Sequence, residues 1–356
     1  MLRRGSMALP PTFVPGFHDE EAVRKIKYNP LGNTGLLVSH LSFGGGPLGG
    51  RNTYGCREFE EAQGIAAVQE AIKKGINYID TAPWYGQGRS EELLGKALKD
   101  IPRQAYYIGT KVARYETDPH KMFDFSAEKT LRSVDHSLKQ LGLDYVDVIQ
   151  VHDIEFAPNL DIVINETLPT LQSVVAAGKA HYIGVTGYPV SLLKQILERS
   201  NTKIDTVLTY TRDTLIDDTL KQYLPFFKEK GLGIITAAGV AMGLLSNSGP
   251  MSWHPAPDNI KQVCAAAGKY CKERGVELGR LAMHYAISQP GTDTHLVGMN
   301  SVELLRSNID ILRNGLSDQE KQILQEVKTK YLDTIKPCHW ENIEVNEYKK
   351  KIEKST

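Results

Sequence analysis

Residues 62–80 read AQGIAAVQEAIKKGINYID, and this stretch holds one helix followed by one strand. Apolar side chains recur at helical spacing from Ile65 to Ile72, and Gly75 provides the helix end. A short apolar strand begins soon afterwards at Tyr78. An amphipathic helix that leads into a buried strand is the repeating unit of proteins with parallel sheets. The stretch therefore predicts an α/β fold, provided that the unit recurs.

The unit recurs along the chain. The expected strands cover 38–43, 78–79, 106–109, 145–151, 181–185, 206–209, 233–236 and 294–297, and the expected helices between them include 62–74, 126–141, 168–177, 190–199 and 220–230. So many strands joined by helical connections favour closure into a barrel over an open sheet. We predict a (β/α)8 TIM barrel, with a doubly wound parallel sheet as the alternative.

Both ends of the chain carry additional elements. Residues 26–28 and 36–38 flank the turn residues 32–35 and predict an N-terminal β-hairpin, and 316–331 predicts a C-terminal helix. We divide the chain into an N-terminal extension (1–26), the barrel (27–332) and a tail (333–356) that can fold over one barrel mouth. Pro10, Pro11 and Pro15 interrupt any secretory signal. A transit segment, or an expression remnant before a native start at Met7, remains an alternative for the first residues.

The composition excludes several classes of function. The 356 residues carry a formal net charge of zero and no basic block, which argues against a nucleic acid or an anionic membrane as partner. No stretch reaches the roughly 18 consecutive apolar residues of a membrane-spanning helix. The four cysteines form no CxxC pair, so we expect neither a disulfide framework nor a zinc site. We expect a cytoplasmic monomer or weak homodimer that acts on a small molecule.

Polar side chains gather where successive strands are expected to end. Asp80 ends the second strand and Tyr85 follows it, Lys111 follows the third strand, and His152 follows the fourth. In an α/β barrel these positions meet at one mouth, where the chemistry takes place.

The four side chains have matching chemical roles. Reduction of a carbonyl by hydride needs a proton donor, and a tyrosine with a pKa of about 10 needs a nearby ammonium to stabilise its anion. Lys111 can supply the ammonium, and Asp80 can balance its buried charge. His152 can hydrogen-bond the substrate oxygen. Each residue alone would be an ordinary structural one, but four at neighbouring strand ends indicate a catalytic site.

A glycine motif is typical of a different fold, but the residues around it do not support that fold. Gly44, Gly46 and Gly49 match the GxGxxG pattern of dinucleotide-binding Rossmann folds. Pro47 and the residues after Gly49 interrupt the helix that a Rossmann unit requires there. We interpret these glycines as part of a flexible loop.

Longer stretches resemble the aldo-keto reductase family. They are YIDTAPWYGQGRSEELLG at 78–95, GTK at 109–111, YVDVIQVHD at 145–153 and LGNTGLLVSHLSFGGGPLG at 31–49, and the resemblance extends from Lys27 to Tyr331. It implies a (β/α)8 barrel, a nicotinamide cofactor, no metal, and a catalytic tetrad at Asp80, Tyr85, Lys111 and His152.

Within that family, further segments look like the L-galactose dehydrogenase-like members. They are FDFSAE at 123–128, HDIEF at 152–156, AMGLL at 241–245, WHPA at 253–256 and LVGMN at 296–300. The resemblance implies oxidation of an aldose such as L-galactose at C1 to its lactone. Trp84 would then stack on the sugar, and His152, Asp153 and Arg212 would bind its hydroxyls. The alternatives are a general aldehyde or ketone reductase and a cofactor-binding regulatory subunit with little turnover; the intact tetrad argues against the latter.

The resemblance also implies where a cofactor would bind. The expected residues are Thr186 and Gly187 for the carboxamide, Tyr210 for the nicotinamide ring, Ala238, Val240, Met242, Gly243 and Leu244 for the pyrophosphate, and Gly298, Asn300, Arg306 and Asn308 for the adenosine. The chain departs from the common pattern with Thr-Gly for Ser-Asn at 186–187 and Ala-Gly for Ser-Pro at 238–239. Gly298 and Leu304 stand where NADP-specific members carry basic residues, and Arg306 is the nearest cation. Of NAD and NADP, this favours NAD.

Overall fold

The computed structural model describes residues 8–51, 53 and 56–354, so expectations about residues 1–7, including the alternative start at Met7, lie outside the described residues. Parallel strands close into a barrel in the order β10-β3-β4-β5-β6-β7-β8-β9. They are β3 (Leu41–Gly44), β4 (Tyr78–Asp80), β5 (Tyr107–Val112), β6 (Val146–Val151), β7 (Ala180–Thr186), β8 (Thr206–Tyr210), β9 (Gly233–Ala237) and β10 (Thr294–Gly298). The predicted (β/α)8 barrel is confirmed, and the open sheet is excluded.

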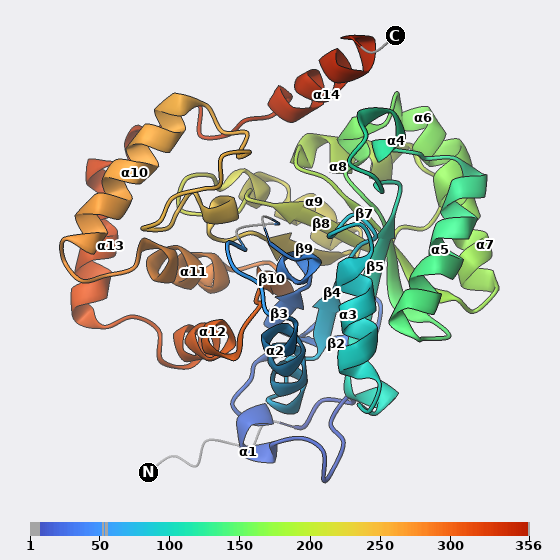
Figure 1. Ribbon diagram of the computed structural model, residues 1–356, viewed down its shortest axis with the longest axis horizontal. Coiled ribbons are helices and arrows are strands. Elements are labelled where there is room, and N and C mark those ends of the chain that lie inside the picture. The colour runs from blue at the N-terminus through green and yellow to red at the C-terminus, as the bar shows by residue number, and fades with distance from the viewer. Residues whose placement is uncertain (1–7, 52, 54–55, 355–356) are drawn as a thin grey trace.

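Helices surround the barrel (Figure 1). They are α1 (Glu20–Val23), α2 (Glu61–Lys73), α3 (Arg89–Leu98), α4 (Pro119–Met122), α5 (Ala127–Leu141), α6 (Leu160–Ile162), α7 (Leu168–Ala176), α8 (Val190–Arg199), α9 (Leu224–Glu229), α10 (Asp258–Lys272), α11 (Leu278–Ser288), α12 (Val302–Asn314), α13 (Asp318–Lys330) and α14 (Ile343–Lys354). The opening stretch is confirmed as α2 followed by β4. No helix among the described residues is long and apolar enough to cross a membrane.

The predicted first strand is divided in two. β2 (Leu37–Ser39) pairs antiparallel with β1 (Tyr28–Pro30) and forms the expected hairpin, whereas β3 joins the barrel. His40 lies between β2 and β3, and its ring contacts the Ile287 carbonyl at 2.7 Å. This contact and the change of pairing partner break what the sequence shows as one apolar run.

The helix expected at 220–230 is also interrupted. A 3-10 turn over Thr219–Gln222 comes before α9, which begins at Leu224. Pro225 stands in the first turn of α9, where its missing N–H is tolerated, but it cannot continue a preceding helix.

Part of the N-terminal extension packs against the barrel. Asp19 caps α1 and accepts a hydrogen bond from Lys74 at 2.7 Å. Thr12 accepts a hydrogen bond from the Asn77 amide at 2.9 Å. Asn77 immediately precedes β4, so this segment contacts the end of the barrel opposite the C-terminal ends of the strands.

Residues 332–354, named here the C-terminal strap, are anchored at the mouth of the barrel. Trp340 stacks on Tyr188, which follows β7, with ring centroids 5.2 Å apart. Glu341 forms a 2.7 Å ion pair with Arg212. α14 lies beside α4 (Figure 1), and its Tyr348 packs edge-on against Phe123 at 5.2 Å. The strap therefore contacts loops on both sides of the strand ends.

A substitution at Gly95 tests how closely α3 packs on α5. A Cβ atom at this position would lie 2.3 Å from the backbone oxygen of Gln140. Although alanine favours helices, we expect Gly95→Ala to lower the free energy of unfolding by roughly 1–3 kcal/mol, because the two helices must separate. Urea denaturation measures this difference.

The matched control is Lys96→Ala on the same helix. Lys96 forms only surface ion pairs with Glu61 and Glu92, so its loss should cost less than about 1 kcal/mol. A Gly95→Ala protein as stable as the wild type would contradict the close approach of the helices.

Candidate active site

A cavity of about 790 Å³ opens at the C-terminal ends of the barrel strands. This volume lies within the range of about 300–1,000 Å³ of small-molecule and cofactor sites. The predicted catalytic and substrate residues that line it are Asp80, Trp84, Tyr85, Lys111, His152 and Asp153. The fold thus brings together side chains that the sequence analysis placed at separate strand ends.

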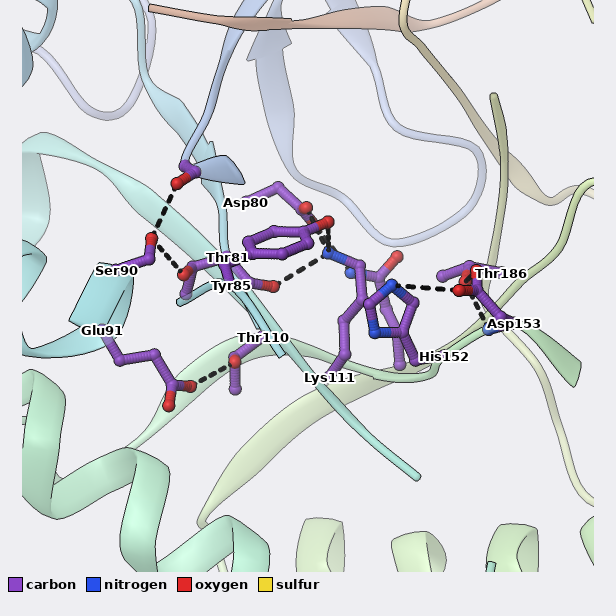
Figure 2. A network of polar contacts seen from close by, with 12 residues as sticks. Asp80, Thr81, Tyr85, Ser90, Glu91, Thr110, Lys111, His152, Asp153 and Thr186 are labelled. Atoms are coloured by element: carbon purple, nitrogen blue, oxygen red, sulfur yellow. Dashed lines mark hydrogen bonds and ion pairs between the residues drawn. The ribbon is translucent and has the colours of Figure 1, made fainter. Parts of the chain in front are cut away.

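Lys111 is the centre of the polar network (Figure 2). Its side chain is almost fully buried, and its ammonium group donates to the Asp80 carboxylate, to the Thr81 carbonyl at 2.8 Å and to the Tyr85 hydroxyl oxygen at 3.0 Å. An ammonium has three protons, so this environment satisfies all of them. The arrangement holds the Tyr85 oxygen at a fixed place on the cavity wall.

Asp80 has a second partner that the sequence analysis missed. The Gln150 amide donates to its other carboxylate oxygen at 2.7 Å. Burial raises the pKa of Asp80, while Lys111 and Gln150 act in the opposite direction. Gln150 pairs in register with Lys111, and it lies two residues before His152, so both point to the same side of β6. A polar residue at an inward strand position was the signal available for Gln150.

Burial controls the protonation of Tyr85. It raises the pKa of the phenol well above 10, Asp80 and Asp153 act in the same direction, and Arg114 opposes them. The sequence analysis expected a nearby ammonium to stabilise the Tyr85 anion. Burial and the two carboxylates act against the anion and keep the pKa of Tyr85 high. At neutral pH the phenol is protonated and can donate a proton.

His152 is held as a neutral imidazole. Burial lowers its pKa to about 3, with Lys111 and Arg114 acting in the same direction and Asp153 opposing them. Its ring lies edge-on to the Tyr85 ring, with centroids 5.8 Å apart. His152 Nδ1 has no hydrogen-bond partner among the described residues. A neutral imidazole beside a phenol can orient a substrate oxygen without adding charge.

Arg114 is a further residue of the site that the sequence analysis did not identify. Its guanidinium donates to Asp153 at 2.6 Å and lies 4.2 Å from the centroid of the Trp84 ring. Although burial opposes it, His152 and Arg114 lower the pKa of Asp153. Arg114 stands just beyond β5, three positions after Lys111, and this placement at a strand end was the available signal.

The buried carboxyl group of Glu91 supports the site from behind. It accepts a hydrogen bond from the Thr110 hydroxyl at 2.6 Å, and Thr110 is the neighbour of Lys111 (Figure 2). Burial raises the pKa of Glu91 to about 7, with Thr110, Ser137 and Lys111 opposing the rise.

Most of the predicted cofactor residues border the same cavity. Those that line it are Thr186, Tyr210, Ala238, Val240, Met242, Gly243, Gly298 and Asn308. Thr186 already uses its hydroxyl group on Asp153, whose backbone N–H donates to it at 3.0 Å. The backbone N–H groups of Gly239 and Val240 have no hydrogen-bond partner in the part of the chain that the structure describes. Such unpaired N–H groups in a tight turn suit a phosphate, so the residues present fit a dinucleotide.

Other predicted residues lie away from the cavity lining. Leu244 is buried in a hydrophobic cluster, and Gly187 packs against Glu155, so that a Cβ there would lie 2.9 Å from a carboxylate oxygen. The Asn300 amide binds the Glu58 carbonyl at 3.0 Å. The Arg306 guanidinium is paired with Glu70 at 2.9 Å.

Arg212, expected to bind sugar hydroxyls, has a different environment. It is almost fully buried, forms ion pairs with Asp217 at 3.0 Å and with Glu341 of the strap at 2.7 Å, and does not line the cavity. The sequence showed that Arg212 follows the strand β8, but it did not show that Glu341 of the strap pairs with it.

The chain is similar to known proteins in sequence and in fold. The chain matches the model of the Aldo/keto reductase family over residues 40–329. It is 40% identical to L-galactose dehydrogenase of Arabidopsis thaliana, over 89% of this chain and 97% of the relative. It is 30% identical to D-arabinose 1-dehydrogenase of Saccharomyces cerevisiae, over 73% of this chain and 82% of the relative. The solved structure of an aldo-keto reductase from Bacillus halodurans in its holo form is similar with a TM-score of 0.66 and 26% identity, covering 85% of this chain and 96% of that one.

Glu91→Gln tests the buried carboxyl group behind the site. The pKa of Glu91 is about 7 in the folded protein and 4.5 as an ordinary glutamate, so the unfolded chain releases this proton at lower pH than the folded one. We expect the unfolding free energy of the wild type, relative to Glu91→Gln, to fall as pH rises from about 4.5 to about 7 and then to level off. Urea denaturation of both proteins across this range measures the difference. A difference that does not change with pH would contradict the assignment.

Proposed function

The chain belongs to the aldo/keto reductase family, and we propose that it oxidises the C1 hydroxyl of an aldose such as L-galactose to the lactone with NAD. The observation that carries the proposal is the Lys111 ammonium, which joins Asp80 to the Tyr85 hydroxyl on the cavity wall. The relatives named L-galactose dehydrogenase, D-arabinose 1-dehydrogenase and D-threo-aldose 1-dehydrogenase support a sugar as the substrate.

The proton moves through Tyr85. The nicotinamide, when bound, would supply the acceptor for the hydride of C1. For oxidation, Tyr85 first releases its own proton to solvent, and the phenolate oxygen then takes the proton of the C1 hydroxyl; in the reverse direction the phenol donates its proton to the carbonyl oxygen. Lys111 donates to that oxygen at 3.0 Å and stabilises it when it carries negative charge.

Groups that line the cavity beside Tyr85 orient the substrate. His152, being neutral, donates or accepts a hydrogen bond at the reacting oxygen without a change of charge. Trp84 offers an apolar ring to a sugar face, and the opposed Arg114 guanidinium holds this ring in place. Asp153, itself held by Arg114, is an acceptor beside the reacting centre.

Two arginines that could bind a 2′-phosphate are already paired with carboxylates, and this supports NAD over NADP as the cofactor. Arg306 is bound to Glu70 at the surface, and Arg280, which lines the cavity, is bound to Asp310 at 2.9 Å and Glu320 at 2.7 Å. A 2′-phosphate would have to displace these carboxylates before it gained a charged partner, whereas a 2′-hydroxyl would not.

One observation favours a second function, the reduction of aldehydes or ketones. Because burial raises the pKa of the Tyr85 phenol well above its usual value of 10, the phenol is prepared to donate a proton. This state serves reduction directly, whereas oxidation must first remove the proton.

Tyr85→Phe tests the proton transfer. We expect loss of turnover by about 1,000-fold or more in both directions, because the ring remains while the acid and base are removed. Cofactor affinity, followed by the quenching of tryptophan fluorescence, should stay close to the wild-type value. Turnover near that of the wild type would remove Tyr85 from the proposed role.

A screen of substrates tests the reaction itself. We expect absorbance at about 340 nm to rise with aldoses and NAD, with a kcat/KM at least about 10-fold higher with NAD than with NADP, since a 2′-phosphate lacks an available partner. Aldehydes and ketones with reduced cofactor form the parallel arm. Turnover restricted to that arm would support the second function, and a preference for NADP would contradict the cofactor assignment.

A further inference from the structure

The strap contributes one acidic side chain to the active-site cavity. Among the described residues that line this cavity, Glu344 is the one that comes from residues 332–354. It stands in the first turn of α14, and its side chain is partly buried. The chemistry proposed above does not use it.

Contacts on both sides hold Glu344 in place. Before it, Trp340 is stacked on Tyr188 and Glu341 is paired with Arg212. After it, Tyr348 packs edge-on against Phe123 and Phe156, with ring centroids 5.2 and 5.6 Å apart. A segment anchored at both ends presents its intervening side chain at a defined position, as a binding residue requires.

The surroundings of Glu344 lie on the substrate side of the cavity. Arg114 and Asp153 both act electrostatically on its carboxyl group, and both also act on Tyr85. Burial raises the pKa of Glu344 to about 7, Asp153 and Glu347 act in the same direction, and Arg114 opposes them. Arg114 therefore connects the region of Glu344 with the region of the reacting oxygen.

The carboxyl group of Glu344 lacks a direct partner. It forms no hydrogen bond or ion pair with the part of the chain that the structure describes, and the Arg114 guanidinium is committed to Asp153 at 2.6 Å. A partly buried carboxyl group without a partner has lost part of its contact with water and has not gained a protein donor in exchange. A ligand with hydroxyl groups can supply that donor.

We propose that Glu344 is a substrate-specificity residue, which accepts a hydrogen bond from an aldose hydroxyl remote from C1 when Tyr85 engages the C1 oxygen. This inference rests on the proposed aldose oxidation. It assigns to the strap a preference for polyhydroxylated substrates, because an unhydroxylated carbonyl compound would cover the carboxyl group and leave it unpaired.

The test compares Glu344→Ala and Glu344→Gln with Glu347→Gln, which removes an exposed carboxyl group one turn along α14. We expect Glu344→Ala to raise KM for the aldose about 10-fold or more, with kcat changed less than about threefold, because the contact binds substrate before and during the reaction. Glu344→Gln, which keeps an acceptor oxygen, should show a smaller rise. Glu347→Gln should keep the wild-type KM within about twofold, as an exposed residue without the contact.

Monodeoxy aldoses identify the contact. For the analogue that lacks the bound hydroxyl, the wild type should already show the raised KM, and Glu344→Ala should raise it by less than about twofold more, since the two changes remove the same interaction. Cofactor affinity by fluorescence and thermal unfolding show that each variant is folded and loaded.

The outcomes separate the two proposals. If the wild type oxidises aldoses and Glu344→Ala retains the wild-type KM, the specificity role is wrong and the proposed function stands. Equal effects of Glu344→Ala on every deoxy analogue also overturn the role, because they indicate a change of the strap instead of a lost contact. If the wild type oxidises no aldose with either cofactor, the proposed function fails and this inference fails with it.

Discussion

A positively charged ammonium group, that of Lys111, lies buried at the mouth of the barrel, and the arrangement of the site depends on it. A buried charge is expensive unless every proton has an acceptor. Here the acceptors are the Asp80 carboxylate, the Thr81 carbonyl and the Tyr85 hydroxyl oxygen. β4 and the loop after it supply all three, and β5 supplies the lysine. The pairing of these two strands therefore sets the position of the Tyr85 hydroxyl group, the proposed proton-transfer group.

The need to pair buried polar and charged groups also applies to the residues around Lys111. Gln150 on β6 satisfies the second oxygen of Asp80, and Glu91 on α3 holds the Thr110 hydroxyl next to Lys111. On the substrate side, Arg114 balances Asp153 and lies over Trp84. Asp80, Lys111, Arg114 and Asp153 thus each have a charged partner on a different element, so that a change in one element would leave a buried charge in another. Such mutual dependence keeps the site in one arrangement.

The sequence alone predicted the barrel and the groups at its strand ends, because both follow from local patterns. Asp80, Lys111 and His152 each stand at the end of an apolar run, and parallel strands bring those ends to one mouth. Local patterns do not report a contact that joins distant segments. Arg212 has the residue type and position of a substrate ligand, yet it pairs with Glu341, which is far along the chain. Arg306 similarly pairs with Glu70. No periodicity in the chain reports such pairings.

In the proposed reaction, the four polar side chains at the strand ends do not by themselves choose a substrate. Asp80, Tyr85, Lys111 and His152 would act on one carbon–oxygen bond, and that bond is similar in an aldose and in a simple aldehyde. Discrimination has to come from groups that contact the rest of the molecule, and these lie on the loops and on the strap instead of the strands. Burial of a polar group that only a hydroxylated substrate can satisfy excludes the others by the cost of the unmade hydrogen bond. In this proposal the barrel strands set the reaction, and the strap brings the carboxyl group of Glu344 to the cavity wall, where it would select the substrate.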